Sequence, residues 1–430
     1  MSRRRGSGSA RPRVLVIVQN LPVPFDRRVW LECQTLTGAG YDVTVVCPQG
    51  HGTGASQVVD GVRILAYRPY APGGGAMGFI TEYAYSFLAT ARLALRARRS
   101  GAFAVVQACN PPDIFWPLAW ALRVLDGTRF VFDHHDLCPE LFESRFPTGR
   151  RAFLRGLLFL ERMTFRTADR VTSTNESYAA IATSRGGKPP ERVTVVRTGP
   201  DPEKLRAREP EPELRRGHDH LVAYLGVMGP QDGVDVALQA ADIVVNRLGR
   251  TDIGFALMGG GDCWTDLVAE RNRLGLEDHV EMPGRVPDDY VVSVFSTAEV
   301  GLSPDPLNPL NDVSTMNKTM EYMSFGLPVV AFDLHETRVS AQDAARYVQP
   351  GDVEAYARAI VELVDDPEAR AEMGRYGRER VETQLAWEHQ RGGYLAVFDD
   401  LSGRTRSASA TPARSARSTA AGRPRVGSGA

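Results

Sequence analysis

Three features are missing from this sequence of 430 residues, and each absence excludes a class of protein. No run of about 18 apolar residues occurs, so we expect no membrane-spanning helix, and the apolar run at 14–18 is too short for a signal peptide. The five cysteines are scattered and lack C-x-x-C or zinc-site spacing, as is typical of reduced thiols in a cytoplasmic protein. The 51 basic and 52 acidic side chains nearly cancel, which removes the charge signal of a nucleic-acid-binding protein. We therefore expect a cytoplasmic protein, with peripheral contact at the inner face of the cell membrane as an open alternative.

Both ends of the chain are basic and poor in large apolar residues. Residues 1–11 consist mostly of Arg, Ser and Gly, and residues 403–430 contain six arginines and no acidic residue. Such a composition buries too little apolar surface to offset the entropy of an ordered chain. We expect both segments to be disordered tails.

Between the tails, short apolar segments rich in β-branched residues alternate with longer helical patterns. Most of these segments are apolar on both faces, which is typical of parallel strands covered by helices on each side. A polar stretch with four prolines at 200–219 interrupts the alternation, which then starts again. The sequence thus predicts the α/β class, with two successive Rossmann-like domains and a cleft between them. The expected divisions are a first domain at 12–199, a linker at 200–219, a second domain at 220–384 and a helix at 385–402 that packs back toward the first domain.

One segment of the second half, S-T-M-N-K-T-M-E-Y-M-S-F-G-L-P-V-V, carries the most chemical information. Ser314 and Thr315 are favourable N-caps and Gly326 is a stop signal, so a helix of about three turns is expected between them. The segment follows a strand and a Pro-rich loop, which places the free N–H groups of the helix at the carboxyl edge of the sheet, where phosphate can bind. Lys318 adds a positive charge, and Glu321 can accept two hydrogen bonds from a sugar diol. An exposed Lys–Glu pair on an ordinary helix is the alternative.

This segment resembles the donor-site signature of glycosyltransferase family 4, whose members have the GT-B fold, with two Rossmann-like βα domains whose parallel sheets face a central cleft. The resemblance implies a retaining hexosyltransferase without cofactor or bound metal. It would move a sugar from a nucleotide-diphosphate sugar, we expect a UDP-sugar, to a glycan or lipid-linked acceptor in cell-envelope polysaccharide synthesis. In the family, the glutamate matching Glu321 holds the ribose, and the preceding turn, here Ser314 and Thr315, holds the diphosphate. Many members carry a second glutamate where this chain has Val313, and the adjacent Asp312 is the candidate to replace it.

Two further segments resemble parts of the family's donor domain. The turn Y-L-G-V-M-G-P-Q-D-G contains Gly226 and Gly229, which would let a diphosphate approach the backbone closely, although a tight structural turn explains them equally well. The later segment E-M-P-G-R-V contains Gly284 and Arg285, where the resemblance implies that backbone groups bind the base.

The first of these turns lacks a charge that the family often has there. Family members frequently place Arg or Lys on the turn to neutralise the leaving phosphate, whereas this chain has Val227 and Asp232 in the comparable region. We therefore expect Lys318 to supply the charge, with Arg285 and Arg338 behind it.

The first domain is expected to hold the acceptor and the residues nearest the reacting sugar. The segment F-V-F-D-H-H-D ends a strand with a polar cluster, and its last pair, His135 and Asp136, matches a His-Asp pair of the family. His135 can hydrogen-bond a sugar hydroxyl, and Asp136 can orient the ring or cap the next helix, so these two and Lys318 form the expected catalytic set. A metal site that adds His134 and Glu140 is the alternative, although no Cys/His partner set accompanies them.

Loops after other strands supply the expected acceptor side of the cleft. Asn20 and Asp26 follow the first strand, and Asn110 and Asp113 follow a later one. Asp26 can equally belong to the charges that begin a helix. The residues at 175–176 fit helix capping better than chemistry.

Two basic amphipathic stretches, 79–99 and 150–166, leave a choice open. Each combines an apolar face with several arginines, so each could lie on an anionic membrane surface where a lipid-linked acceptor would be found. Helices that cover the core and keep their arginines in water explain them as well.

Other function classes fit less well. No G-x-G-x-x-G follows the first strand, which disfavours an NAD-dependent dehydrogenase. A sugar-nucleotide epimerase on the same fold would need further acidic residues. A non-catalytic subunit that binds sugar nucleotide stays an alternative because of Val313, Val227 and Asp232.

Overall fold

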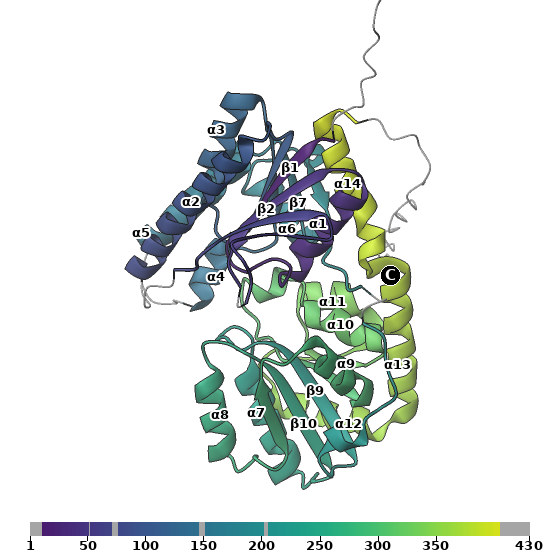
Figure 1. Cartoon of the computed structure of the whole chain (residues 1–430). Helices are drawn as coiled ribbons and strands as arrows, with labels where there is room; N and C mark the ends of the chain where they lie inside the picture. Colours follow the sequence, from purple (N-terminus) through teal and green to yellow (C-terminus); the bar gives the residue numbers. More distant parts are fainter. Residues whose placement is uncertain (1–10, 51, 71–75, 146–150, 202–204, 405–430) are drawn as a thin grey trace, which may run out of the picture.

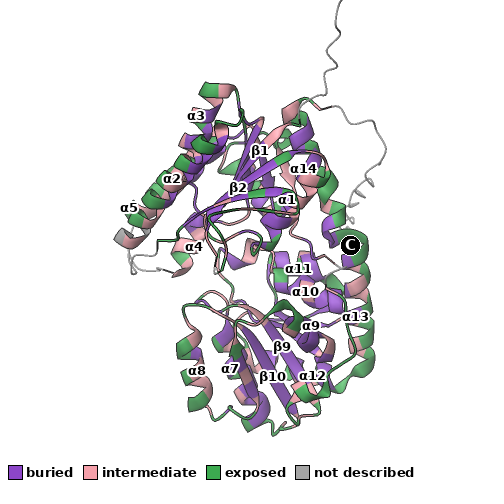
Figure 2. Ribbon diagram, viewed as in Figure 1, coloured by how far each residue is buried: buried purple, intermediate pink, exposed green. Residues whose placement is uncertain are grey.

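The computed structural model describes residues 11–50, 52–70, 76–145, 151–201 and 205–404. Most of the expected tails therefore lies outside the described residues, as do parts of the linker and of the stretch at 150–166. The described chain forms two α/β lobes, one from each half of the sequence (Figure 1). Buried residues concentrate in the strands and on the helix faces turned toward them (Figure 2).

The first lobe is built on an eight-stranded sheet in the order β3-β4-β2-β1-β5-β6-β7-β8. Its strands are parallel except for the edge strand β3, which runs antiparallel to β4. The sequence analysis did not predict β3, because its residues are alternately exposed and half-buried and so lack a continuous apolar run. The strands are β1 Arg13–Ile17, β2 Asp42–Pro48, β3 Ser56–Val59, β4 Val62–Tyr67, β5 Val105–Cys109, β6 Arg129–His134, β7 Arg170–Ser173 and β8 Val193–Val195.

Helices cover both faces of this sheet, as strands that are apolar on both sides require. Along β1, Val14 and Val16 pack into the core that lies under α1, while Leu15 and Ile17 pack into the opposite core under α2, α3 and α5. This alternation is the period of two that an extended chain imposes. The helices are α1 Arg27–Gly38, α2 Ala76–Arg98, α3 Trp116–Asp126, α4 Cys138–Arg145, α5 Arg151–Thr167 and α6 Glu176–Ser184.

The second lobe has a six-stranded sheet, parallel throughout, in the order β11-β10-β9-β12-β13-β14. Strand order reverses at β9, which lies between β10 and β12, and ligands of open α/β sheets bind outside the carboxyl ends at such a point. The strands are β9 His220–Val227, β10 Ile253–Gly260, β11 Val280–Gly284, β12 Val300–Ser303, β13 Val329–Phe332 and β14 Ala345–Val348. The helices are α7 Val234–Asp242, α8 Trp264–Arg273, α9 Asp288–Thr297, α10 Asn317–Phe325, α11 His335–Ala341, α12 Val353–Asp365 and α13 Pro367–Arg380.

The chain crosses between the lobes twice, and the two crossings touch. A Cβ atom on Gly199 would lie 2.0 Å from the carbonyl oxygen of Leu385, so only glycine fits there. Next to this contact, the amide of Trp387 donates to the carbonyl of Pro200 at 3.2 Å. At this second crossing α13 ends at Arg380, a π-helical turn follows, and the extended backbone of Ala386 precedes α14.

After the second crossing, α14 (Trp387–Ser402) lies beside α1 on the first lobe (Figure 1). Tyr394 and Phe398 are fully buried in the same core as Val14 and Val16 of β1. The terminal helix is therefore a structural part of the first lobe.

Candidate active site

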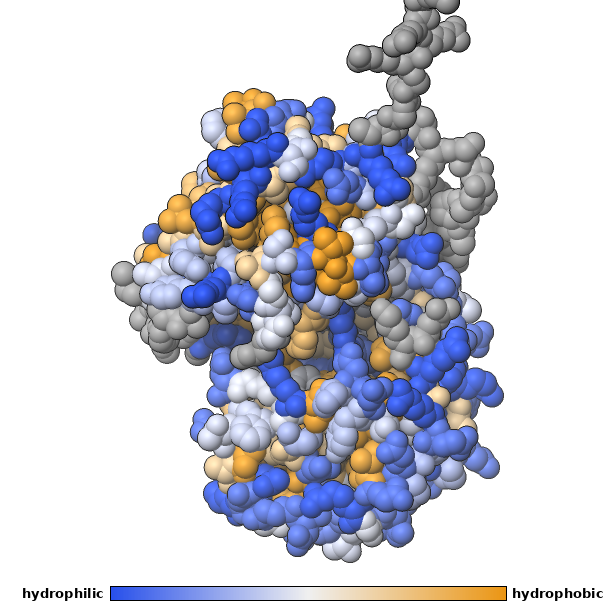
Figure 3. Space-filling model, viewed as in Figure 1, coloured by the Kyte–Doolittle hydropathy of each residue, from blue (hydrophilic) through white to orange (hydrophobic). Residues whose placement is uncertain are grey.

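The loops at the carboxyl ends of the two sheets face each other across the waist of the molecule, which the space-filling view shows as a narrowing between the lobes (Figure 3). Direct hydrogen bonds join the two sides. Asn175, at the start of α6, donates to the carbonyl of Val313 at 2.9 Å and to the hydroxyl of Thr315 at 3.0 Å. The hydroxyl of Tyr178 lies 2.9 Å from that of Ser314. The segment that precedes α10 thus sits against the first lobe.

The N-cap of helix α10 lies one residue after Thr315 and two after Ser314, the two expected caps. Its N-cap is Met316, which has no side-chain cap hydrogen bond, so the prediction that Ser314 and Thr315 cap the helix is wrong. Both hydroxyls take part in the contacts with α6 instead. Because no side chain caps α10, its first amides and the positive end of its dipole are available to an anion.

Lys318 lies in the first turn of α10 but is not a free charge. Its side chain is 9% exposed, its Nζ is 2.6 Å from Oδ1 of Asp305, and it lies over the ring of Tyr224. Burial by itself lowers the pKa of the Lys318 ammonium, but the carboxylates of Asp305 and Asp232 raise it overall. The ammonium therefore stays protonated, with much of its field cancelled by Asp305.

The glycine-rich turn is also partly occupied by a carboxylate. Oδ2 of Asp232 accepts a hydrogen bond of 2.9 Å from the amide of Gly229. Burial raises the pKa of Asp232 to about 6; Lys318 opposes this rise and Asp305 adds to it. At Gly226, a Cβ would lie 2.6 Å from the hydroxyl of Tyr224, so the close approach of Tyr224 is a structural reason for glycine at this position. An anion that approached the amide of Gly229 would meet the carboxylate of Asp232.

Glu321 lies one turn further along α10 and faces the first lobe. Its Oε1 is 2.8 Å from Nη1 of Arg27, while Nη2 of the same guanidinium is 2.5 Å from Asp288 of α9. The side chain of Glu321 is 16% exposed, and burial raises the pKa of its carboxyl although Arg27 opposes the rise. Glu321 therefore points to the interlobe crevice, as its proposed role with a ribose requires.

Across the crevice, His135 is held by a buried ion-pair network. Its Nδ1 is 2.9 Å from Oδ2 of Asp133, and the guanidinium of Arg28 contacts both oxygens of Asp133, at 2.7 and 3.1 Å. Thr172 also donates to Asp133, and Glu32 lies 3.3 Å from Arg28. Since Asp133 takes Nδ1, the ring can offer only Nε2 to a ligand.

The charges of this network depend on one another. Burial alone would raise the pKa of Asp133, but Arg28 and His135 hold it well below its usual range. Burial lowers the pKa of His135, yet Asp133 raises it overall. Burial, with Asp133 adding to it, raises the pKa of Glu32 to about 8. One guanidinium thus stabilises Asp133 as an anion.

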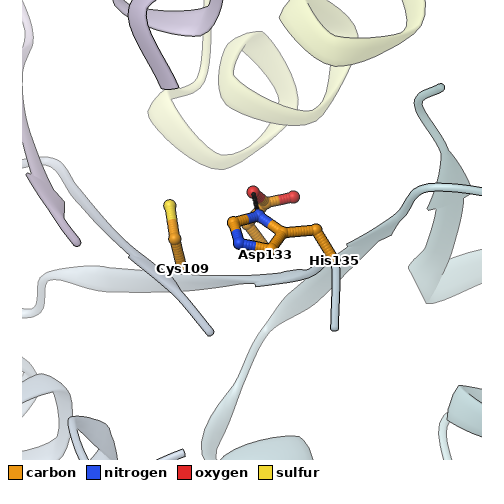
Figure 4. Close-up of side chains that lie close together, drawn as sticks. All are labelled: Cys109, Asp133 and His135. Atoms are coloured by element: carbon orange, nitrogen blue, oxygen red, sulfur yellow. Dashed lines mark hydrogen bonds and ion pairs between the residues drawn. The ribbon is translucent and has the colours of Figure 1, made fainter. Parts of the chain in front are cut away.

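The metal alternative does not fit the positions of its residues. His134 points away from His135 into an apolar site, where it packs on Phe165 and Tyr178, and Glu140 pairs with Arg185. A different trio, Cys109, Asp133 and His135, has ligand-type atoms within 4.8 Å of one another at neighbouring strand ends (Figure 4). Arg28 already neutralises the only carboxylate of this trio and would repel a cation.

The expected acceptor residues have several different local roles. Oδ1 of Asn110 accepts from the amides of His135 and Asp136, so Asn110 braces the loop that follows β6. Asp136 accepts from the amide of Leu137 rather than from the imidazole. Asp136 therefore acts on the backbone just before α4. The residue that orients His135 is Asp133, which the sequence analysis did not select.

The other residues on this side differ in exposure. Asp26 caps α1 through the amide of Val29 at 3.0 Å. Asp113 is buried near Cys138, and burial raises its pKa to about 7. Asn20 is exposed near the start of the loop that joins β1 to α1. The structure thus gives Asp26 a capping role and leaves Asn20 open to a ligand.

The remaining donor-side candidates are spread around the second lobe. Gly284 ends β11, followed by the exposed Arg285. Asp312 accepts from the amide of His335 at 2.9 Å and so caps α11. Arg338 is half-exposed and pairs with Asp333. In this arrangement neither Asp312 nor Arg338 contacts Lys318 or Glu321.

Comparisons with known proteins bear on the fold and the family of this chain. Residues 26–204 match the model described as Glycosyltransferase Family 4, and residues 219–366 match the model described as Glycosyl transferases group 1. The chain is 26% identical to 2-deoxystreptamine glucosyltransferase of Streptomyces kanamyceticus over 257 residues, which span 57% of this chain and 64% of the relative. It is 28% identical to the GDP-mannose-dependent alpha-(1-6)-phosphatidylinositol monomannoside mannosyltransferase of Mycolicibacterium smegmatis over 301 residues, 69% of this chain and 75% of the relative.

Solved structures show the same fold at low identity. Sucrose-phosphate synthase from Thermosynechococcus elongatus superposes with a TM-score of 0.73 at 16% identity, covering 92% of this chain and all of the other. Anabaena Alr3699/HepE in complex with UDP-glucose superposes with a TM-score of 0.67 at 15% identity, covering 91% and 99%. The two facing lobes and these superpositions define the GT-B fold. With both of its domains matched, the chain belongs to glycosyltransferase family 4.

Proposed function

We propose that this protein is a retaining hexosyltransferase that moves a sugar from a UDP-sugar to a glycan or lipid-linked acceptor in cell-envelope polysaccharide synthesis. The observation that carries the proposal is helix α10, whose uncapped N-terminus and Glu321 both face the first lobe. The α10 amides would bind the diphosphate, and Glu321 would hold the ribose. UDP-glucose is the ligand of the HepE structure, whereas some relatives are named as GDP-mannose-dependent, so both donors belong in the test.

The first lobe would contribute the sugar and acceptor side. His135, with Nδ1 held by Asp133, would present Nε2 to a hydroxyl of the transferred sugar. The leaving diphosphate would help to take the proton from the attacking hydroxyl. Closure of the lobes would exclude water, which strengthens each of these electrostatic contacts.

A lipid-linked acceptor, reached by peripheral contact with an anionic membrane, is the acceptor that we propose. Among the described residues, no helix has both the length and the apolar character needed to cross a bilayer. Three helices of the first lobe, α2, α3 and α5, nevertheless have exposed apolar side chains, and α2 and α5 also have exposed arginines, which suits a bilayer surface. The exposed apolar residues are Ile80, Leu88 and Leu95 of α2, Trp120, Val124 and Leu125 of α3, and Phe159 of α5.

A transfer assay with radiolabelled donors tests the function and the acceptor together. The enzyme would be incubated with UDP- or GDP-sugars and either a membrane lipid extract or water-soluble glycans. Label in the lipid fraction would support the full proposal, and label only in soluble glycan would contradict the lipid-linked acceptor. Interconversion of the donor without transfer would favour an epimerase, and donor binding without turnover would favour a non-catalytic subunit.

Glu321→Ala should weaken the binding of the nucleotide about 10- to 100-fold. The substitution removes both carboxylate oxygens, and hydrogen bonds to a charged group contribute about 1.5–3 kcal/mol. Isothermal titration calorimetry with UDP and GDP measures the effect. Glu372→Ala, at an exposed position on α13, is the matched control and should bind like the parent. Equal affinity in Glu321→Ala would refute the ribose role.

Donor affinity should increase as the pH falls from 7.5 to 5.5, because Asp232 loses its negative charge near pH 6. An ionised Asp232 next to a diphosphate disfavours binding, and a shift of one pKa unit on binding corresponds to about tenfold in affinity. A nucleotide-sugar is the suitable ligand, since its diphosphate does not titrate in this range. Asp232→Asn should bind about tenfold tighter at pH 7.5 and lose the pH dependence. The exposed Asp235→Asn is the control, and a parent-like profile in Asp232→Asn would contradict the assignment.

A further inference from the structure

Arg27 is a cation of the first lobe that reaches the helix proposed to hold the nucleotide. It is the first residue of α1, and its two terminal nitrogens contact two different elements of the second lobe, Glu321 of α10 and Asp288 of α9. The side chain of Arg27 is 47% exposed and that of Asp288 is 78% exposed. The guanidinium therefore has room to change its partners.

The contact with Glu321 conflicts with the proposed role of that carboxylate. A ribose diol that donates two hydrogen bonds to Glu321 uses both of its oxygens, and Arg27 occupies one acceptor position of Oε1 at 2.8 Å. The side chain of Glu321 is only 16% exposed, so a ribose that reaches Oε1 meets the guanidinium and would displace it.

A released guanidinium would be close to a site whose nearest ionisable groups have a net negative charge, although the field of Arg145 of α4 also reaches Asp232. Lys318 is committed to Asp305, and Asp232 occupies the amide of Gly229, so the three ionisable groups carry a net charge of −1 when both acids are ionised. Residues three apart on a helix have Cβ atoms about 5–6 Å apart, so Glu321 holds Arg27 within one turn of Lys318 and the α10 N-terminus. A long arginine side chain can span that distance.

We propose that Arg27 exchanges partners when the donor binds: the ribose takes Glu321, and the freed guanidinium binds the diphosphate. Arg27 then supplies, from the opposite lobe, the charge that the glycine-rich turn does not carry. A planar guanidinium is suited to this role because it binds phosphate oxygens through two parallel hydrogen bonds. The inference rests on the proposed donor site at α10.

The exchange makes opposite predictions for two ligands that differ only in the diphosphate. In Arg27→Ala, UDP should bind at least about tenfold more weakly, because a charge-assisted hydrogen bond to phosphate is lost. Uridine should bind about two- to fivefold more tightly, because Glu321 no longer has to leave an ion pair that is partly exposed. Calorimetry measures UDP, and displacement of UDP measures the weaker uridine; GDP and guanosine replace them if the parent binds GDP instead. Arg27→Lys should restore part of the UDP affinity.

Arg208→Ala is the matched control, since Arg208 forms an exposed ion pair with Asp289, next to Asp288 on α9, without reaching Glu321. It should leave both affinities unchanged. Weaker binding of uridine as well as UDP in Arg27→Ala would mean that Arg27 orients Glu321, and unchanged binding of both would mean a simple surface ion pair; either result overturns the exchange. A parent enzyme that binds neither UDP nor GDP would instead refute the donor site itself, and the exchange with it.

Discussion

His135→Ala should lower kcat by about 10²–10³-fold while changing the affinity for the nucleotide little. A preorganised hydrogen bond that strengthens as charge develops in the transition state contributes about this factor. His135 suits the role because its Nδ1 lies 2.9 Å from Oδ2 of Asp133. This contact fixes the tautomer of the ring and leaves Nε2 for the sugar. Steady-state transfer kinetics and calorimetry with UDP measure the two quantities separately.

The split between turnover and binding is the informative part of that experiment. His389→Ala, an exposed histidine of α14, should transfer sugar like the parent. His135→Asn keeps a polar side chain and should fall between the parent and the alanine variant. Parent-like kcat in His135→Ala would remove the histidine from the mechanism, and an equal loss in UDP affinity would place it in the donor site.

Arg28→Met should lower the free energy of unfolding by about 3–5 kcal/mol, because removing one partner of a buried ion pair leaves its charge without compensation. The guanidinium is 6% exposed and faces two fully buried acids, Asp133 and Glu32. The midpoint of urea unfolding, with an unchanged slope, measures the loss. Arg170→Met is the control: its ion pair with Asp400 is partly exposed, so its removal should cost about 1 kcal/mol or less.

The pH dependence of this loss has a definite sign. Burial and Asp133 already raise the pKa of Glu32 to about 8, so the folded state binds a proton there more tightly than the unfolded chain does. A carboxyl whose pKa is raised on folding destabilises the protein as the pH rises through that interval. Without Arg28 the pKa of Glu32 rises further, so the loss in the free energy of unfolding should be greater at pH 8 than at pH 5. A loss that is equal at both pH values would contradict the role of Arg28 as the counter-ion.

The sequence was sufficient for the fold because the strands are apolar on both faces. Val14 to Ile17 and Leu221 to Tyr224 are runs that a parallel sheet buries from both sides, and each appears as a strand in the expected place. Two edge strands were missed, β3 and β14, because neither has a continuous apolar run that is buried throughout. The edge position by itself did not hide a strand, since the edge strands β8 and β11 were among the predicted apolar segments.

The candidate site was predictable where one segment determines it and not where distant segments meet. The position of Glu321 toward the crevice follows from the helix that contains it. The pairing of Lys318 with Asp305 joins a helix to a separate loop, and the role of Asp133 depends on Arg28, more than a hundred positions earlier. A signal was nevertheless present for the last pair. The two adjacent arginines after Asp26 lie at the start of a helix, where neighbouring side chains have different surroundings. An acid inside an apolar strand such as β6 needs a buried counter-charge.

Because α14 completes the core under α1, the first lobe is not a continuous piece of polypeptide. Tyr394 and Phe398 fill that core, and the ribosome makes them only after the whole second lobe. The usual order in which an N-terminal domain matures first is therefore reversed at this point. During synthesis the second lobe can finish folding while the α1 side of the first lobe is still exposed to solvent. This exposed apolar surface is where a chaperone would bind.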